Sequence, residues 1–501
     1  MIARQKWLLV LLTGAVAITR FVFRSHYLYD LDSVNFALAM RRFDPRVHQP
    51  HPPGYFLYVC LGRLLNLVFH NANLALVVLS ILASCALVVL IYKLTLDWFG
   101  PMAAQFGGLF FLFSPLAWFH GIVALTYSVE AFFSGLLGYL CWRIESGRAG
   151  FVLPAAVALG VSAGVRPSSL LFLTPLFLFS LRKATPKGRG VGLAALAATL
   201  TAWFVPMVSI CGGVRVYFDA LFSLWRMVPS NFTVFNSSPA NSIARAFTIV
   251  FIFLLIFGAA SLAPLGALAS SAPTDSRKKN FTFVWIGPAL CFFTFGYLRF
   301  VTSGYLLLLC APACLWFGFW ASEGYQASTW RRSSKLAVIG LGAAVNVAIF
   351  IASPFYCSYR QVRRFEAELE SVTTALPQLG LPQDTLLISF DSHFIGFRHV
   401  GYYLPDYLTV EYPEAHLKEG IRVFSMHQRD TRLLTELPGG PYTRFVLCSL
   451  PNDAPYLDYF QKVVARLPSK SLQTVSLGGH EYVTGSVSDL RLLFPDLVTP
   501  P

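Results

Sequence analysis

The sequence has few charged residues and none of the short motifs that mark common soluble enzymes. Only 13% of its 501 residues are charged, whereas soluble proteins carry about 25%. No P-loop, GxSxG or HExxH pattern occurs, so nothing points to a nucleotide-driven, serine-hydrolase or zincin mechanism. The nine cysteines are scattered and form no CxxC pair, which favours buried thiols over a metal site or a disulfide framework.

The chain instead contains many long apolar runs. Hydrophobic residues make up 55% of the chain, and a membrane-spanning helix needs about 20 apolar residues. We therefore predict a polytopic α-helical membrane protein with about eleven spans. The net charge of +14 lies largely in short loops, which fits an orientation signal better than nucleic-acid binding. The expected spans are 7–23, 73–92, 102–120, 129–142, 151–164, 168–181, 191–210, 246–268, 281–297, 303–320 and 336–353.

Loop charges predict which side of the membrane each loop faces, because Lys and Arg favour the cytoplasmic side. The apolar segment 54–70 contains Arg63, and the later basic clusters fall inside only if this segment lies flat on the outer surface. We expect a multi-pass protein of a cell membrane, of the bacterial inner-membrane type, with a cytoplasmic N-terminus. The outer face then carries 24–72, 121–130, 165–167, 211–245, 298–302 and everything after 354.

The first span raises two smaller questions. It contains the small-residue pattern Ala15-Val16-Ala17, which is typical of a signal-peptide cleavage site. The apolar stretch continues beyond that pattern, so we favour an uncleaved span. Arg20 interrupts it and is expected to snorkel to the interface.

The composition changes after Pro354. Residues 356–501 hold charges throughout and lack any run of membrane length. We predict a transmembrane domain over 1–354, with 24–72 as a long first outer loop that includes a juxtamembrane helix. A soluble extracytoplasmic α/β domain follows over 355–501. Its expected helix is 358–376, and its expected strands are 386–390, 407–412, 422–426, 444–450, 474–479 and 482–487.

The first outer loop holds an unusual cluster of ionisable side chains. Asp30 and Asp32 come just after the first span, and His51 precedes two prolines that restrict the backbone. Ionisable groups beside a membrane segment indicate a functional site. The alternatives are solvated acids for the two aspartates and a simple helix start for the His-Pro-Pro triplet.

Further candidates fall on other expected outer loops. Glu130 follows Tyr127 at the outer end of a span, where an acid also suits a helix N-terminus. Arg166 and Arg299 lie between spans on the face where few arginines are expected. Guanidinium groups bind phosphate in a bidentate fork, although snorkelling to the interface is the alternative. Tyr305 lies in the same segment as Arg299 and joins the candidate substrate-binding residues.

The order of these motifs resembles the GT-C superfamily of integral-membrane glycosyltransferases. That superfamily includes the protein O-mannosyltransferases and the lipid A aminoarabinose transferases. The run Asp32-Ser33-Val34-Asn35-Phe36 is similar to the acidic motif of the first outer loop, and His51-Pro52-Pro53 is similar to the segment that follows it. Glu130 stands where the acid of the second loop is expected. The wider run DSVNFALAMRRFDPRVHQPHPPGYFLYV looks like a bacterial branch of uncharacterised members.

The resemblance implies an enzyme that takes a polyprenyl-phosphate sugar as donor. It implies transfer of a hexosyl or pentosyl group, with inversion, to a hydroxyl of a lipid, glycan or protein on the non-cytoplasmic side. Asp32 is the implied general base, with Glu130 in support and Asp30 as a fallback. The implied substrate-binding residues are His51, Arg166, Arg299, Tyr127 and Tyr305. We expect no cofactor and no nucleic acid, and Ser33 in place of the family's glutamate weakens the case for a divalent metal.

Two other readings stay open. A transporter or flippase of lipid-linked sugars would also use a basic, aromatic outer surface, although it would more often show an internal repeat. Alternatively, the helices only anchor a working C-terminal domain, in which Asp391 and His393 follow an expected strand.

Overall fold

The computed structural model describes residues 2–227, 243, 275–296, 300–354, 357–390, 392, 394–412, 423–438, 441–449, 460–465, 467 and 472–494. The chain divides into two compact units. Unit 1 comprises Met1–Arg24 and Tyr55–Gln361, and unit 2 comprises Ser25–Gly54 and Val362–Pro501. Most of the first loop ahead of segment 54–70, which the sequence analysis grouped with the transmembrane part, therefore clusters with the C-terminal residues.

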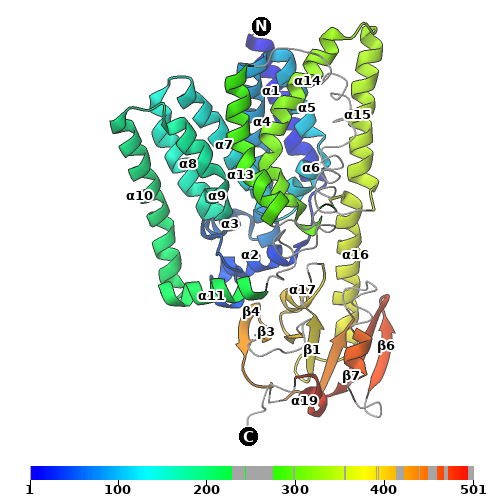
Figure 1. The fold of residues 1–501 in the computed structure, drawn as a ribbon. Helices are drawn as coiled ribbons and strands as arrows, with labels where there is room; N and C mark the ends of the chain where they lie inside the picture. Colours follow the sequence, from blue (N-terminus) through cyan, green and yellow to red (C-terminus); the bar gives the residue numbers. More distant parts are fainter. Residues whose placement is uncertain are drawn as a thin grey trace. The chain divides into compact units, whose positions relative to one another are not determined.

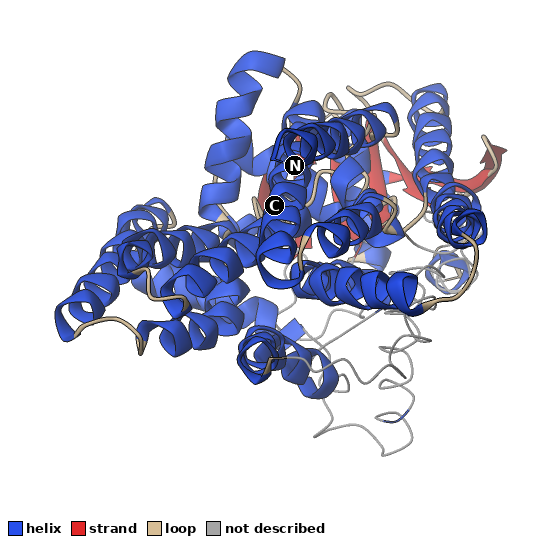
Figure 2. Ribbon diagram, turned by 90° about the horizontal axis from the view of Figure 1, so that it is seen from above, coloured by secondary structure: helices blue, strands red, loops and turns tan. Residues whose placement is uncertain are grey.

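Unit 1 consists of α-helices that follow the apolar runs of the sequence (Figure 1). Helices α5, α6 and α10 each begin with a proline in the first turn, where its missing N–H needs no partner. Figure 2 shows several long helices close to end-on. The elements are α1 (Ile2–Val22), α3 (Phe56–Phe69), α4 (Ala72–Phe99), α5 (Pro101–Leu112), α6 (Pro115–Ile122), α7 (Tyr127–Glu145), α8 (Val152–Val165), α9 (Ser168–Leu181), α10 (Pro186–Ile210), α11 (Val214–Met227), α13 (Ser276–Cys291), the 3-10 helix η8 (Phe300–Leu309), α14 (Cys310–Ala327) and α15 (Arg332–Ala352).

Five stretches of helix among the described residues are long and apolar enough to cross a membrane, or six if the bent pair α5 and α6 forms one span. They fall on α1, α4, α10, η8 with α14, and α15. Other expected spans fall on α7, α8, α9 and α13, which do not meet that standard of length and apolarity. The expected span 246–268 lies outside the described residues. The helical membrane class is supported, whereas the predicted number of eleven spans is not confirmed.

The expected span 102–120 is broken, and a buried arginine lies at the break. Helices α5 and α6 are bent by 55° relative to each other. Arg20 of α1 is fully buried, and its Nη1 and Nη2 donate to the carbonyls of Leu112 and Phe111 at 2.9 and 3.3 Å. The last carbonyls of a helix have no partner within it, so the guanidinium caps the end of α5. The prediction that Arg20 snorkels to the interface is therefore wrong.

Two helices present exposed apolar side chains. Helix α3, from the ambiguous segment 54–70, exposes Leu64, Leu67 and Val68. Helix α11 exposes Phe218 and Phe222, four residues apart. An apolar stripe at helical spacing is typical of a helix that lies in a membrane interface. Helix α3 therefore fits the predicted interfacial role, and α11 shows the same pattern, while their position relative to a membrane stays a prediction.

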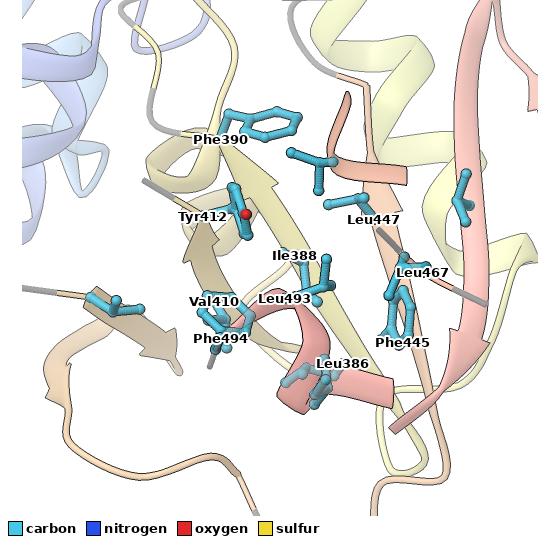
Figure 3. Packing of buried hydrophobic residues seen from close by; sticks show 14 of the residues in the cluster. Leu386, Ile388, Phe390, Val410, Tyr412, Phe445, Leu447, Leu467, Leu493 and Phe494 are labelled. Carbon is cyan, nitrogen blue, oxygen red and sulfur yellow. The ribbon is translucent and has the colours of Figure 1, made fainter. Parts of the chain in front are cut away.

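Unit 2 contains one mixed sheet with strand order β4-β3-β2-β1-β5-β7-β6. Strand β1 pairs in parallel with β2 and β5, and the other neighbours are antiparallel. Alternate residues of β1 and β2, including Ile388 and Val410, enter an apolar core (Figure 3). The strands are β1 (Thr385–Phe390), β2 (Leu408–Tyr412), β3 (Val423–His427), β4 (Asp430–Leu434), β5 (Arg444–Cys448), β6 (Gln473–Leu477) and β7 (His480–Ser486).

The predicted α/β character of the C-terminal part is confirmed, and one strand was missed. Strand β4 reads DTRLL, which is too polar and too short to stand out from a loop. Helix α16 (Tyr359–Ala375) matches the predicted helix 358–376 closely, whereas the short helix α17 (Phe397–Tyr403) was not expected. The first-loop part of unit 2 forms α2 (Leu31–Arg41) and the 3-10 turn η1 (Pro45–Val47).

Candidate functional site

Asp30 and Asp32 take different positions at the start of α2. Asp30 is the N-cap residue, and its Oδ1 accepts a hydrogen bond from the backbone N–H of Asp32 at 2.9 Å. This bond satisfies one of the donors that every helix leaves unpaired at its N-terminus. Asp32 lies in the first turn, where the helix dipole stabilises a negative charge. The Asp30 carboxylate thus caps the helix, whereas the Asp32 carboxylate takes no part in this cap.

The Asp32 carboxylate lies beside the His51 imidazole. Asp32 Oδ1 and His51 Nδ1 are 3.1 Å apart, and the side chains are 28% and 17% exposed. The contact is an ion pair when the imidazole is protonated. The structure therefore brings together two of the candidates from sequence, in a place that solvent reaches only partly.

His51 is set by the turn that it begins. The backbone N–H of Gly54 donates to the carbonyl of His51 at 3.2 Å, which closes the turn over the two prolines. Gly54 has φ 113°, a conformation that favours glycine because a Cβ would be strained there. On the other side, the ring of Phe36 from α2 lies 6.2 Å from the imidazole, measured between centroids. Turn and helix together fix where the imidazole can lie.

In unit 1, Glu130 and Arg166 form a buried ion pair. Glu130 Oε2 lies 3.1 Å from Arg166 Nε, and the side chains are 2% and 5% exposed. Ser169 donates to Glu130 Oε1 at 2.9 Å, and Arg166 Nη1 donates to Thr126 Oγ1 at 2.6 Å. Glu130 lies in the first turn of α7 and Arg166 is the C-cap residue of α8, so the pair joins two helix ends. The reading of Arg166 as a snorkelling side chain does not fit its burial.

Aromatic rings surround the Arg166 guanidinium. Its Cζ lies 4.4 Å from the ring centroid of Tyr305, 4.5 Å from that of Tyr127 and 5.8 Å from that of Tyr55. The faces of aromatic rings attract a cation, and most strongly where water is excluded. Tyr127 and Tyr305, both candidates from sequence, therefore contact Arg166 and help to fix it.

His120 of α6 is a polar residue that the sequence analysis missed. It is fully buried, and neither ring nitrogen has a hydrogen-bond partner among the described residues. Its ring lies 4.8 Å from that of Tyr127, between centroids. A histidine within the apolar stretch PLAWFHGI was the available signal, because ionisable residues in membrane segments are often functional.

Some candidates cannot be placed. Arg299 lies outside the described residues, as do Asp391 and His393 of the C-terminal alternative. Glu130 and Arg166 belong to unit 1, whereas Asp30, Asp32 and His51 belong to unit 2. Within the described part of the chain, no group of three or more His, Cys, Asp or Glu side chains is arranged to hold a metal ion.

Comparison with known proteins agrees with the family resemblance seen in the sequence. Residues 46–188 match the model of the N-terminal domain of the protein O-mannosyl-transferase TMEM260. This range includes His51, Glu130 and Arg166 but not Asp32. No curated protein matches the sequence.

Solved structures share the fold. The structure of ArnT from Cupriavidus metallidurans bound to undecaprenyl phosphate is similar with a TM-score of 0.61 and 12% identity, over 95% of this chain and 97% of that one. The apo state of the same protein gives 0.58 and 13% over the full length of both chains. The apo oligosaccharyltransferase of Archaeoglobus fulgidus gives 0.53 and 11%, over 94% of this chain and 73% of that one. The predicted resemblance to GT-C membrane glycosyltransferases is confirmed, and the chain has their fold.

Proposed function

We propose that this chain is a membrane glycosyltransferase that moves a sugar from a polyprenyl-phosphate carrier to a hydroxyl group. The observation that carries the proposal is the Asp32–His51 pair, at 3.1 Å, at the start of α2 in a chain with the GT-C fold. The similar ArnT structure contains undecaprenyl phosphate, which supports a polyprenyl-phosphate donor. The O-mannosyl-transferase match supports a hexose and a protein hydroxyl over the other sugars and acceptors.

The proposed step is a single displacement at the anomeric carbon. The acceptor oxygen forms a bond to the anomeric carbon while the bond from that carbon to the phosphate oxygen breaks. The acceptor proton passes to the Asp32 carboxylate, and polyprenyl phosphate leaves with the electron pair. Attack opposite the leaving group inverts the anomeric configuration, and the step needs neither a metal nor another cofactor.

His51 and Asp32 divide the work in this proposal. The ion-pair contact between a protonated His51 Nδ1 and Asp32 Oδ1 would hold the carboxylate in one orientation and leave Oδ2 to take the acceptor proton. Asp30 acts through the helix start that it caps. Within the helical unit, Glu130 pairs with Arg166 and fixes the ends of α7 and α8. Arg299 remains the candidate phosphate ligand. We propose that the reaction takes place on the non-cytoplasmic face.

Two aspartate variants test the base assignment, because they remove one charge each at positions two residues apart. Asp32→Asn should lower the transfer rate by about 10²- to 10⁴-fold, the usual contribution of a general base. Asp30→Asn is the matched control, since asparagine caps a helix about as well as aspartate, and it should keep most of the activity. The assay supplies membranes with radiolabelled polyprenyl-phosphate sugars and measures new glycosidic bonds.

Two results would overturn the proposal. Transfer by Asp32→Asn at the wild-type rate would remove the base assignment. Movement of labelled donor across the membrane without a new glycosidic bond would instead identify a flippase of lipid-linked sugars.

A further inference from the structure

The residues around Asp32 and His51 are fixed by helix α17 and strand β4 of the same unit. Ahead of α2, Leu28 has both backbone groups engaged: its N–H donates to the Tyr403 hydroxyl at 2.8 Å, and its carbonyl lies 3.1 Å from His399 Nε2. Both partners belong to α17. The attachment lies four residues before Asp32, so it holds the chain just ahead of α2.

A second attachment precedes His51. Asp44 and Gln49 form an isolated antiparallel bridge that closes the segment 44–49 into a tight hairpin. Gln49 Nε2 donates to Thr431 Oγ1 of β4 at 3.1 Å. Arg398 of α17 donates to the same Thr431 oxygen at 3.0 Å and to the carbonyl of Val47 at 3.2 Å. The hairpin is thus held two residues before the imidazole.

The second attachment is buried and partly charged. Gln49 and Thr431 are fully buried and Arg398 is 3% exposed. Hydrogen bonds from a guanidinium are stronger than neutral ones, and they strengthen further away from water. Losing one would leave a buried polar group unpaired, which costs more than the bond itself contributes. The hairpin therefore has one strongly preferred position against α17 and β4.

Resting on the proposed function, we infer that the C-terminal α/β domain positions the Asp32–His51 pair, with Arg398 as the central positioning residue. Attachments flank both members of the pair, so a shift of the hairpin would change the distance between carboxylate and imidazole. Catalytic geometry tolerates little displacement, since a shift of about 1 Å costs on the order of 100-fold in rate. In this proposal the domain acts on the chemistry through the loop that it holds.

The test compares Arg398→Met and Arg398→Lys with Arg444→Met. Arg444 is an exposed arginine of the same sheet that donates to the carbonyl of Leu379 at 3.4 Å, away from the loop. For Arg398→Met we expect kcat to fall roughly 10- to 100-fold. The KM for donor should change less than about twofold, because ground-state binding is kept. Arg398→Lys, which can keep one charged hydrogen bond, should recover part of kcat, and Arg444→Met should resemble the wild type.

Hydrogen exchange gives a readout that needs no activity. Peptides covering 44–51 should exchange faster in Arg398→Met, while peptides from β1 and β2 should keep wild-type protection. If the wild type transfers no sugar, the proposed function fails, and the exchange result alone decides the inference. If Arg398→Met does not fold, Gln49→Leu removes the attachment from the loop side and is measured in the same way. Wild-type exchange over 44–51, or a kcat unchanged by loss of the attachment, would overturn the inference.

Discussion

Removal of one member of the Glu130–Arg166 pair should destabilise the helical unit strongly. The Arg166 side chain is only 5% exposed, and Glu130→Leu would remove its carboxylate partner. Among the described residues, Thr126 and the tyrosine rings would be its remaining contacts. Arg166→Met would leave the carboxylate with serine hydroxyls alone. In both cases the remaining ionisable group is left without its partner at a buried site, where keeping a charge is costly.

Burial sets the expected magnitude. Breaking a buried ion pair by removing one partner costs about 3–5 kcal/mol, because the remaining charge is uncompensated. The double variant Glu130→Leu/Arg166→Met leaves no charge and should lose less than either single variant, since an apolar replacement of a whole pair is often tolerated. The coupling free energy between the two positions should therefore be at least about 3 kcal/mol.

A double-mutant cycle measures this coupling in purified, detergent-solubilised protein unfolded by denaturant titration. The control cycle uses Arg364 and Glu368 on α16, which are 2.7 Å apart but 53% and 22% exposed. That pair should couple by only about 0.3–0.5 kcal/mol. If the Glu130 and Arg166 effects add to within about 0.5 kcal/mol, the pair is not an interacting buried unit and the reasoning is refuted.

Gly304→Ala would place a Cβ 2.4 Å from the ring of Tyr127 and should cost about 1–3 kcal/mol through overpacking. Gly340→Ala meets nothing within 4 Å and should stabilise its helix by up to about 1 kcal/mol, so equal shifts in unfolding midpoint would contradict the packing. Arg20→Met removes the guanidinium donors to the Leu112 and Phe111 carbonyls, although Phe111 still accepts from the backbone N–H of Ser114. The change should cost about 1–3 kcal/mol, and an unchanged unfolding midpoint would argue against the cap. Burial lowers the pKa of His480, so the folded state binds this proton less readily than the unfolded chain. The stability that this difference contributes is fully present above about pH 6.5 and is lost as pH falls through the folded pKa. His480→Gln should therefore reduce the fall of the thermal midpoint on acidification, and an unchanged fall would contradict this pKa shift.

The membrane helices could be predicted because their signal is local. Runs of apolar residues mark α1, α4, α10 and α15 directly. The interruption within 102–120 was harder to foresee, because its clearest signal, Ser114-Pro115, is common at ordinary helix starts. The buried position of Arg20 at that break depends on a neighbouring helix that is distant in sequence.

The contacts of the candidate residues could be predicted only in part. A family motif marked Asp32 and His51 as candidates, but nothing in the sequence predicted that their side chains contact each other. Thr431 and Arg398 are hydrogen-bonded to the hairpin 44–49 across more than 300 positions of sequence. No local sequence pattern indicates such a contact. Strand β4, which supplies Thr431, was missed because it is polar and short. Its side chains bind the loop in addition to its pairing within the sheet.

Arg166 shows why burial changes the meaning of a candidate residue. A guanidinium has five N–H donors in a planar fork. Its Nε faces Glu130, and its Nη1 donates to Thr126. A phosphate could still accept from Nη2, but it would meet a pair whose net charge is zero. Attraction at long range would then be weak, and binding would depend on hydrogen bonds made at short range. The phosphate role predicted for Arg166 therefore requires a second cation to draw the donor in, and Arg299 is the candidate for that cation from the sequence.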